Sequence, residues 1–318
     1  MRPSPNKSSL RAGVIGVGAF GRHHASKYAQ SSGVVLSAIA DLSADVRARA
    51  SAELDVATFA NWKDLIGRVD MVSVCSPAST HAEIVRGFLA AGVHVLVEKP
   101  IATDLDEADE LIALAEKKNL VLTVGHQERF VFANSGILDY ADAPLSLESV
   151  RTGPWTGRGA DVSVVLDLMI HDLDLVRCLI PHDIVDVQAF GRTLHGKFRD
   201  EVGAVLRFAN GSECKLFSSR VAESRRRSLR AVYPDGTIKI DFLARKMFNT
   251  TRRQLKPLNM ADPLAESLNS FVSAVQGGAT TLVRPAEARR ALEGALMIED
   301  ASTPLFDGLP YDAVALSA

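Results

Sequence analysis

The feature that most constrains the fold is a glycine-rich turn that follows a short apolar segment near the start of the chain. In "LRAGVIGVGAFGRHHASKYA" the glycines stand at positions 16, 18 and 21, the G-x-G-x-x-G spacing. We expect a strand over residues 11–16, a tight turn, and a helix from about Phe20. In a dinucleotide-binding fold the first glycine permits the turn, the second lets the cofactor pyrophosphate approach the backbone, and the third lets helix and strand pack closely. The free amides and positive dipole end of such a helix predict a phosphate site at this turn.

The remainder of the first half alternates apolar strands with helical segments. The strands are expected at "VVLSAIAD", "MVSVCSP", "VHVLVEKP" and "LVLTVGH", and the helices at "SADVRARASAEL", "THAEIVRGFLAAG" and "DLDEADELIALAEKKN". This alternation predicts right-handed crossovers and a parallel sheet. A chain of 318 residues is long enough for about two domains. We assign residues 1–127 to a dinucleotide-binding Rossmann domain and residues 128–318 to a second domain.

The second expected strand ends at Asp41, 20 residues after Gly21. An acidic residue at this point bonds the ribose hydroxyls of NAD and repels the 2′-phosphate of NADP. No arginine follows directly, since Leu42 and Ser43 come next and Arg47 is six residues on. The pattern therefore favours NAD over NADP. Asp41 is also a candidate N-cap of the following helix, a role that does not exclude the first.

Polar side chains follow three of the expected strands. They are Ser76-Pro77 with His81, Glu98-Lys99-Pro100, and the run from His126 to Arg129. Functional residues of a parallel sheet gather at the carboxyl ends of its strands. Lys99 is the most informative of them, because a strongly hydrated ammonium at the end of a buried strand costs free energy and Pro100 favours an extended conformation for it. The alternative explanation is a structural ion pair with Glu98 or another carboxylate.

The second half of the chain has a different pattern, with short strands separated by turns such as Ala209-Asn210-Gly211 and Pro234-Asp235-Gly236. Strands are expected in "AFGRTLHGKF", "VGAVLRFANGSECKLFSSR" and "SLRAVYPDGTIKIDFLARKMFNTT". We expect a mostly antiparallel sheet, one face of which must be covered by helices or by another subunit. Two helices, over residues 265–277 and 285–299, are expected near the end.

Within this half, "VVLDLMIHDLDLVRCLI" contains a carboxylate and an imidazole four residues apart. On an α-helix, Asp167 and His171 would share one face, and the carboxylate could fix the tautomer of the imidazole and raise its basicity. The packed side would consist of Met169, Leu173, Val176 and Ile180. A purely structural histidine is the alternative.

Composition excludes several classes of function. A net charge of −2 gives no electrostatic footprint for nucleic acid, and no apolar run approaches the roughly 20 residues of a membrane span. The basic segment 1–11 precedes an apolar run broken by glycines, which predicts a disordered tail and not a secretory signal.

The cysteines and histidines predict no metal centre. Cys75, Cys178 and Cys214 are far apart and predict neither a disulfide framework nor a zinc site, and Asp167 with His171 is too small a ligand set for a metal. We therefore expect a cytoplasmic protein with no metal.

Taken together, the chain resembles the glucose–fructose oxidoreductase / inositol dehydrogenase / MocA family of sugar dehydrogenases over nearly its whole length. The resemblance rests on "GVIGVGAFG", "SPASTHAEI", "VEKP" and "DLMIHDLDL". It implies an α/β protein with a parallel, doubly wound, NAD-binding Rossmann domain over residues 1–127 and a substrate-binding and oligomerisation domain over residues 128–318. The second domain would be an α/β domain whose large open, mostly antiparallel sheet often makes homodimer or homotetramer contacts. It also implies oxidation of a secondary alcohol with NAD, in which a hydride goes to the nicotinamide and a proton leaves the hydroxyl.

The resemblance assigns roles to individual residues. Lys99 becomes the catalytic acid/base, with Asp167 and His171 completing the site, and the choice between Lys99 and His171 as the base stays open. The residues implied in cofactor binding are Gly16, Gly18, Ala19, Phe20, Gly21, Asp41, Ser76, Pro77, His81, Glu98 and Lys99.

The segments "HQERF" and "RTGPWTGRGADVSVVLDLMIHDLDLV" resemble most the UDP-N-acetylglucosamine 3-dehydrogenase branch, whose product leads to diamino-sugar lipid A. A nucleotide-sugar needs cations for its diphosphate and an aromatic platform for its base. The residues implied in substrate binding are Lys99, His126, Arg129, Arg151, Trp155, Arg158, Asp167 and His171. For the arginines and the tryptophan, surface and packing roles stay open, and we expect the run of arginines at 225–227 to be solvated or to contact another subunit.

Three other functions remain. A dehydrogenase of a free sugar or cyclitol such as myo-inositol would not need the arginines. A sugar transhydrogenase would hold its nicotinamide tightly. A non-catalytic NAD-responsive regulator would have no need of Lys99, Asp167 and His171, all of which are present.

Overall fold

The computed structural model describes residues 9–132, 135–140, 142–278 and 283–304. The chain forms two compact units: residues up to 126 with residues 262–289, and residues 127–261 with residues 290 onward. The expected disordered tail at 1–11 lies mostly outside the described residues.

The first unit is built on a six-stranded, all-parallel sheet with the strand order β3-β2-β1-β4-β5-β6. The strands are β1 Leu10–Ile15, β2 Val34–Ala40, β3 Ala57–Phe59, β4 Met71–Val74, β5 His94–Val97 and β6 Leu122–Val124. The helices are α1 Gly21–Gln30, α2 Ala44–Leu54, α3 His81–Ala90, α4 Leu105–Lys118 and α7 Pro263–Val275, with 3₁₀ turns η1 Trp62–Leu65 and η2 Ala78–Thr80. The predicted parallel sheet is confirmed, while β3 was not predicted. Strand order reverses between β1 and β4, which is where doubly wound sheets bind their ligands.

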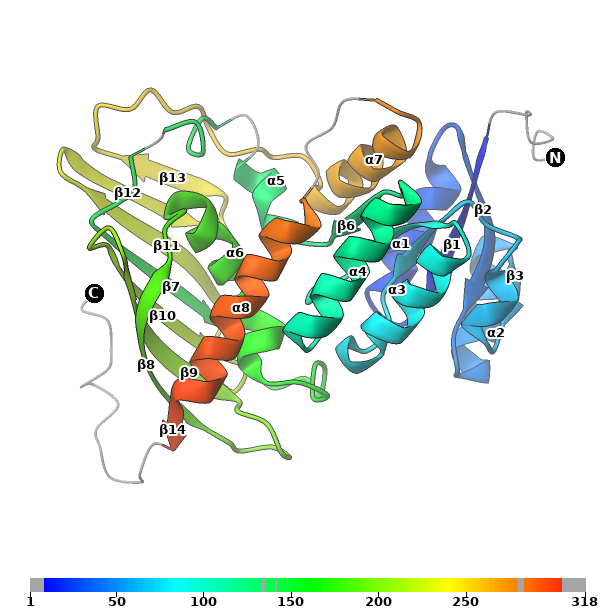
Figure 1. Cartoon of the computed structure of the whole chain (residues 1–318), viewed down its shortest axis with the longest axis horizontal. Helices are drawn as coiled ribbons and strands as arrows, with labels where there is room; N and C mark the ends of the chain where they lie inside the picture. The colour runs from blue at the N-terminus through cyan, green and yellow to red at the C-terminus, as the bar shows by residue number, and fades with distance from the viewer. Residues whose placement is uncertain (1–8, 133–134, 141, 279–282, 305–318) are drawn as a thin grey trace. The chain divides into compact units, whose positions relative to one another are not determined.

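Local sequence explains the ends of these helices. Asp104 caps α4 by accepting hydrogen bonds from the amides of Asp106 and Glu107, and Asn119 ends it in the left-handed conformation. Helices α3 and α4 lie side by side (Figure 1), joined by the two-pronged pair of Arg86 with Glu110.

Helix α7 is part of the first unit although it lies far along the sequence. Leu264, Leu268 and Phe271 belong to the same buried cluster as Tyr28 of α1 and Leu36 of β2. The division at residues 127 and 128 stays a prediction, and it does not include this return of the chain to the first unit.

The second unit contains an eight-stranded sheet in the order β13-β12-β11-β7-β10-β9-β8-β14. The strands are β7 Ser146–Thr152, β8 Ile184–Arg192, β9 Glu201–Phe208, β10 Glu213–Ser219, β11 Arg226–Tyr233, β12 Gly236–Asp241, β13 Lys246–Asn249 and β14 Ser302–Pro304. Among the described strands of this sheet, only the pairs β10/β7 and β14/β8 are parallel. The mostly antiparallel sheet and the hairpin turn at 209–211 are as predicted, with Gly211 at φ +87°.

One predicted strand segment is wrong. Strand β8 ends at Arg192, and residues 193–198 of "AFGRTLHGKF" form an irregular loop. The amides of Leu194 and His195 both donate to the carboxylate of Asp200 at 2.6 Å, so they are not available to a neighbouring strand.

The second unit contains the helices α5 Glu128–Phe132 and α6 Ile170–Leu179 and, from Arg290 onward, most of α8 Pro285–Ala301. A π-helical segment, Val165–Met169, precedes α6. Helices α6 and α8 lie on one face of the eight-stranded sheet (Figure 1). Gly294 of α8 permits this packing, because a Cβ there would lie 3.3 Å from Ile184 of β8 and 3.4 Å from Leu173 of α6. None of the described helices is long and apolar enough to cross a membrane.

Candidate active site

The three glycines of the glycine-rich turn have different roles. Two of them are required by the packing of the chain itself, and the third leaves an open surface. Gly16 has φ +78°, and a Cβ on it would lie 2.7 Å from the amide nitrogen of Ser76. A Cβ on Gly21 would overlap the carbonyl oxygen of Gly16. Gly18, by contrast, has no atom within 4 Å of such a Cβ, and no side chain caps the first turn of α1. An extended phosphate group fits this turn against Gly18 and the helix amides.

Asp41 lies directly after β2 and holds the glycine-rich turn. Its Oδ2 accepts the amide of Val17 at 2.9 Å, and its Oδ1 accepts the amide of Ser43 at 2.9 Å. The predicted alternative role as helix N-cap is wrong, because the side chain of Ser43 takes that position and accepts from Val46. Each carboxylate oxygen of Asp41 keeps a second lone pair that could accept a ribose hydroxyl.

The carboxyl end of β5 carries Glu98 and Lys99. Glu98 is 8% exposed, its carboxylate lies against the Cα of Gly125, and its Oε1 lies 3.2 Å from Nε2 of the fully buried His24. Lys99 is half-buried, and the bond between it and Pro100 is cis. The predicted neighbour His126 follows β6 and is 1% exposed. Sequence reasoning missed His24 because its distance from Glu98 along the chain gives no signal.

His81 lies between two strand ends. Its Nδ1 is 2.7 Å from the carbonyl oxygen of Pro100, and its Nε2 is 2.9 Å from the carbonyl oxygen of Ser76. Burial lowers its pKa, although both carbonyl contacts and the charge of Glu98 act in the opposite direction. The first unit therefore brings Ser76, His81, Glu98 and Lys99 together beside the glycine-rich turn.

In the second unit, Asp167 lies in the π-helical segment and not in an α-helix as predicted. Such segments are rare and occur often at functional sites. The side chain of Asp167 lies against Gly159, whose φ of +65° lets the loop before the helix approach that carboxylate. The predicted packed side is confirmed, since Met169, Leu173, Val176 and Ile180 are fully buried.

Two of the predicted substrate-binding arginines lie in ion pairs within this unit. Arg151 is 2% exposed, and it donates to Asp172 at 2.9 Å and to Glu128 at 3.0 Å. Arg129 donates to both carboxylate oxygens of Asp174, at 2.7 and 2.6 Å. Burial acts to lower the pKa of Arg151, and the two carboxylates outweigh it, so that pKa is raised. A substrate phosphate would have to displace buried carboxylates to reach Arg151, which makes this arginine unsuited to the predicted contact with the substrate.

The loop before the π-helical segment carries the other two predicted residues. The Trp155 ring stacks on His195, with centroids 4.4 Å apart and planes 16° apart, and the guanidinium carbon of Arg220 lies 5.2 Å from the Trp155 centroid. Arg158 is exposed between two glycines with positive φ, Gly157 and Gly159. Arg158 thus stands at the tip of a turn whose next residue contacts Asp167.

The loop is fastened by a buried ion pair that the sequence did not suggest. Arg220 donates to Asp200 at 2.7 Å and to the carbonyl oxygens of Gly159 and Val162 at 2.6 and 3.0 Å. Both side chains of the pair are at most 5% exposed. Because Arg220 follows the loop by some 60 residues, only the folded sheet brings the two together.

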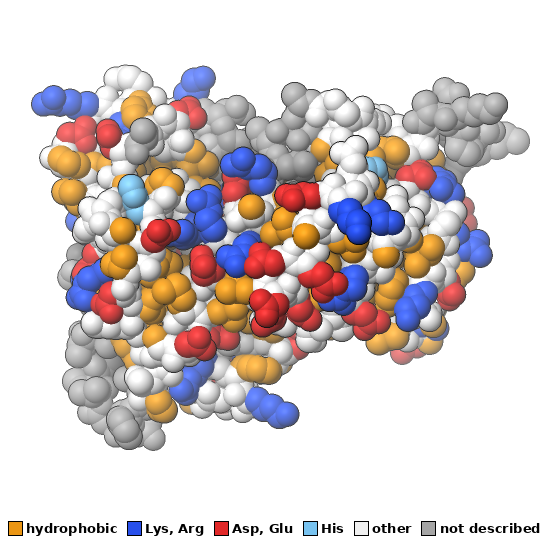
Figure 2. Space-filling view, viewed as in Figure 1, with side chains coloured by type: hydrophobic (Ala, Val, Ile, Leu, Met, Phe, Trp, Pro, Cys, Tyr) orange, Lys and Arg blue, Asp and Glu red, His pale blue; other side chains and the backbone are white. Residues whose placement is uncertain are grey.

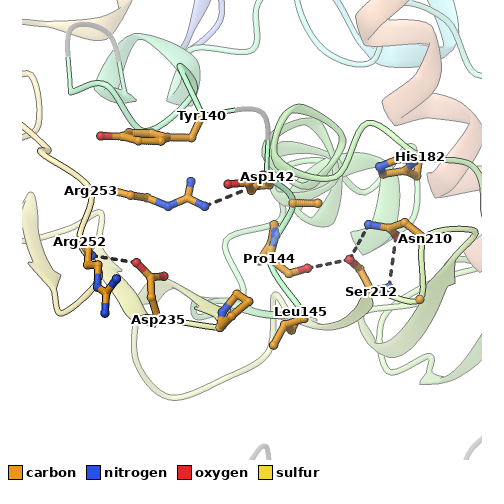
Figure 3. Close-up of a pocket in the computed structure, with 13 residues that line it drawn as sticks. Tyr140, Asp142, Pro144, Leu145, His182, Asn210, Ser212, Asp235, Arg252 and Arg253 are labelled. Atoms are coloured by element: carbon orange, nitrogen blue, oxygen red, sulfur yellow. Dashed lines mark hydrogen bonds between the residues drawn. The ribbon is translucent and has the colours of Figure 1, made fainter.

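The second unit also contains a cavity of about 780 Å³, lined by loops that join its strands (Figure 3). Arg253 lies in it between Tyr140 and Tyr233, 4.6 and 3.8 Å from the two ring centroids. The amide of Arg252 donates to Asp235. None of the predicted site residues lines this cavity, and its two arginines are matched by two aspartates, so its charge favours no class of ligand.

Comparison with known proteins shows the family. The profile of the oxidoreductase family with an NAD-binding Rossmann fold matches residues 10–126, and that of the GFO/IDH/MocA C-terminal domain matches residues 137–239. UDP-N-acetylglucosamine 3-dehydrogenase of Acidithiobacillus ferrooxidans is 34% identical over 91% of this chain and 96% of its own. A solved structure of that enzyme has a TM-score of 0.85, at 35% identity, over 92% of this chain and 98% of its own.

Two inositol dehydrogenases are also similar. Myo-inositol 2-dehydrogenase of Thermotoga maritima is 29% identical over 67% of this chain and 69% of its own. Scyllo-inositol dehydrogenase from Lactobacillus casei, solved with NAD(H) and scyllo-inositol, shares the fold with a TM-score of 0.78 at 19% identity, over 92% of this chain and 97% of its own. The chain therefore belongs to the Gfo/Idh/MocA family of oxidoreductases, and residues 10–126 form that family's NAD-binding Rossmann domain.

Proposed function

We propose that the protein is an NAD-dependent dehydrogenase that oxidises the 3-hydroxyl of UDP-N-acetylglucosamine. The observation that carries this proposal is the 34% identity to a UDP-N-acetylglucosamine 3-dehydrogenase over nearly the whole of both chains. The similarity to the Thermotoga myo-inositol 2-dehydrogenase covers only about two thirds of each chain. The product would enter the assembly of diamino-sugar lipid A.

The residues of the first unit fit NAD. The open surface at Gly18 and the uncapped first turn of α1 suit a pyrophosphate, and Asp41 suits the adenosine ribose. When bound, NAD supplies the acceptor for the hydride that leaves the sugar carbon. Glu98 and Ser76 lie at the ends of β5 and β4, where the nicotinamide half would lie, and Glu98 would offer its carboxylate to the second ribose.

In this proposal Lys99 removes the proton from the 3-hydroxyl, while Asp167 and His171 orient the sugar and complete the proton path. The neutral amine of Lys99 would accept the hydroxyl proton, and the ammonium that forms is a compact donor that holds the sugar oxygen. His171 stays the competing candidate for the base. The pH dependence of kcat in a His171→Gln variant separates the two candidates. If Lys99 is the base, the acidic limb of the profile, where protonation of the base lowers kcat, stays in place.

Arg158 is the cation that we propose for the substrate diphosphate. It is exposed at the tip of a Gly-Arg-Gly turn, and Gly159 brings that turn to Asp167. Trp155 is stacked on His195, so one face of the ring is covered, and we propose that Trp155 mainly anchors the loop.

The substrate assignment is tested by following NADH formation with UDP-N-acetylglucosamine, myo-inositol and glucose in parallel. An aminotransferase with its amino donor removes the ketone and pulls an unfavourable oxidation forward. Turnover with the nucleotide-sugar alone supports the proposal. Turnover with a free cyclitol would show that the cyclitol, and not the nucleotide-sugar, is the substrate. NAD binding without turnover of any sugar would favour a non-catalytic NAD-responsive regulator.

We also propose that the protein works in the cytoplasm as a homodimer or homotetramer. The family resemblance supports the oligomer, because the open sheet of the second domain often makes subunit contacts in such proteins. Light scattering after size-exclusion chromatography measures the mass, and a monomer at micromolar concentration would contradict this part.

A further inference from the structure

His81 was expected to contact the cofactor, but its ring faces protein backbone on both sides. It is 1% exposed and begins helix α3. One ring nitrogen lies 2.7 Å from the Pro100 carbonyl oxygen and the other lies 2.9 Å from the Ser76 carbonyl oxygen. Both polar atoms of the ring are therefore used within the first unit, and neither is left for a ligand.

The two carbonyls belong to the segments that carry the proposed catalytic machinery. Ser76 follows β4, and Pro100 is the residue directly after Lys99. On the other side of Lys99, the amide of Glu98 donates to the carbonyl oxygen of Val74 at 2.8 Å. The backbone of Lys99 is thus tied to β4 on its N-terminal side and to α3, through His81, on its C-terminal side.

We propose that His81 is a positioning residue, which holds the Pro100 carbonyl and thereby aims Lys99 at the reacting hydroxyl. This inference rests on the proposed function. Displacing a catalytic group by about 1 Å can cost roughly 100-fold in rate, so loss of this contact should affect the chemical step. The NAD affinity should be largely preserved, because the pyrophosphate and adenosine ribose contacts proposed at Gly18 and Asp41 do not involve His81.

The chemistry of the ring supports the assignment. A neutral imidazole has one N–H and can donate to only one of the two carbonyls, whereas the imidazolium donates to both. In either state the ring fills the space between the two segments. Leucine fills a similar volume without any donor, and glutamine keeps an N–H that can reach one carbonyl.

The test compares His81→Leu and His81→Gln with the matched variant His94→Gln. His94 is a half-buried histidine at the opposite end of β5, where its Nδ1 accepts the amide of Val121 at 2.9 Å. We expect kcat to fall at least 30-fold in His81→Leu and less in His81→Gln, with the Kd for NAD changed less than threefold in both. The kinetic isotope effect on kcat with substrate deuterated at the reacting carbon should rise, because the chemical step becomes limiting. His94→Gln should match the wild type in all three.

Two results would overturn the inference. One is a wild-type kcat in the His81 variants. The other is a loss of NAD affinity as large as the loss of kcat, together with an unchanged isotope effect. A merely structural role of His81 would give this second result. If His81→Leu does not fold, His81→Gln carries the comparison. Failure of the proposed function can be distinguished from failure of this inference, because the wild type itself would then oxidise no sugar. If the wild type oxidises a sugar other than the proposed one, the variants can be compared with that sugar.

Discussion

At the scale of single residues, Lys99 is the side chain on which the proposed chemistry depends. It is half-buried, and the contacts of Glu98 with Val74 and of Pro100 with His81 hold the backbone on either side of it. The end of the strand explains why a cation is tolerated here: β5 ends at Val97, so Lys99 lies beyond the buried strand and stays partly exposed.

We predict that Lys99→Met lowers kcat by roughly 10²–10⁴-fold, the usual contribution of a positioned acid or base. NAD binding, measured by nicotinamide or protein fluorescence, should change less than threefold. The matched control is Lys118→Met, on the surface of α4, which should leave both quantities unchanged. Turnover in Lys99→Met near the wild-type value would show that another group handles the proton.

At the scale of elements, the turn between β1 and α1 contains one glycine that is needed for folding and another that is needed for cofactor binding. A methyl group on Gly21 would overlap the Gly16 carbonyl, whereas one on Gly18 would point into open space. We predict that Gly21→Ala lowers the melting temperature by several degrees, since a destabilisation of about 1 kcal/mol shifts it by roughly 2–4 °C in a domain of this size. Gly18→Ala should melt like the wild type but bind NAD at least tenfold more weakly. Equal NAD affinity in Gly18→Ala and the wild type would contradict the predicted path of the pyrophosphate.

The loop over 153–162 depends on the buried pair of Arg220 and Asp200. We predict that Arg220→Met lowers the free energy of unfolding by about 3–5 kcal/mol, because it leaves Asp200 buried without its cation. The double variant with Asp200→Asn should recover part of this loss. Arg207→Met, which removes the exposed pair with Asp186, should cost at most about 1 kcal/mol. Urea unfolding measures all three, and equal losses for Arg220→Met and Arg207→Met would refute the account.

The same pair predicts how stability depends on pH. Burial acts to raise the pKa of Asp200, but the amides of His195 and Leu194 and the guanidinium of Arg220 outweigh it, so that the folded-state pKa is lowered. The resulting stability is present above the unfolded-state value of about 3.9 and is lost as pH falls through the lower folded-state pKa. Between pH 5 and pH 2, the melting temperature of the Asp200→Asn variant should therefore fall less steeply than that of the wild type. Parallel curves would contradict the assignment.

Local patterns predicted the features that depend on neighbours in the chain. The glycine spacing indicated the turn at 16–21, and strand ends indicated the position of Lys99. Features that join distant segments gave no such signal, and the pairs Arg220–Asp200 and Arg151–Asp172 are examples. The π-helical form of Val165–Met169 was also missed, since residues that favour an α-helix occupy it and tertiary packing decides the difference.

At the scale of the whole molecule, charge agrees with a small-molecule enzyme. The net charge is −2, and Figure 2 shows acidic and basic side chains interspersed on the visible face without a large area of one sign. Such a surface gives no strong electrostatic attraction to nucleic acid. The cations proposed for the substrate are therefore local ones, above all Arg158.

The most direct test of the central claim uses UDP-N-acetylglucosamine deuterated at C3, with NAD and the coupled aminotransferase. We predict that the reduced cofactor carries the deuterium, as measured by mass spectrometry of the isolated cofactor, and that the Lys99→Met variant forms little deuterated cofactor. Reduced cofactor without deuterium would show that another carbon is oxidised. If no reduced cofactor forms although NAD binds, the protein is not a dehydrogenase of this nucleotide-sugar.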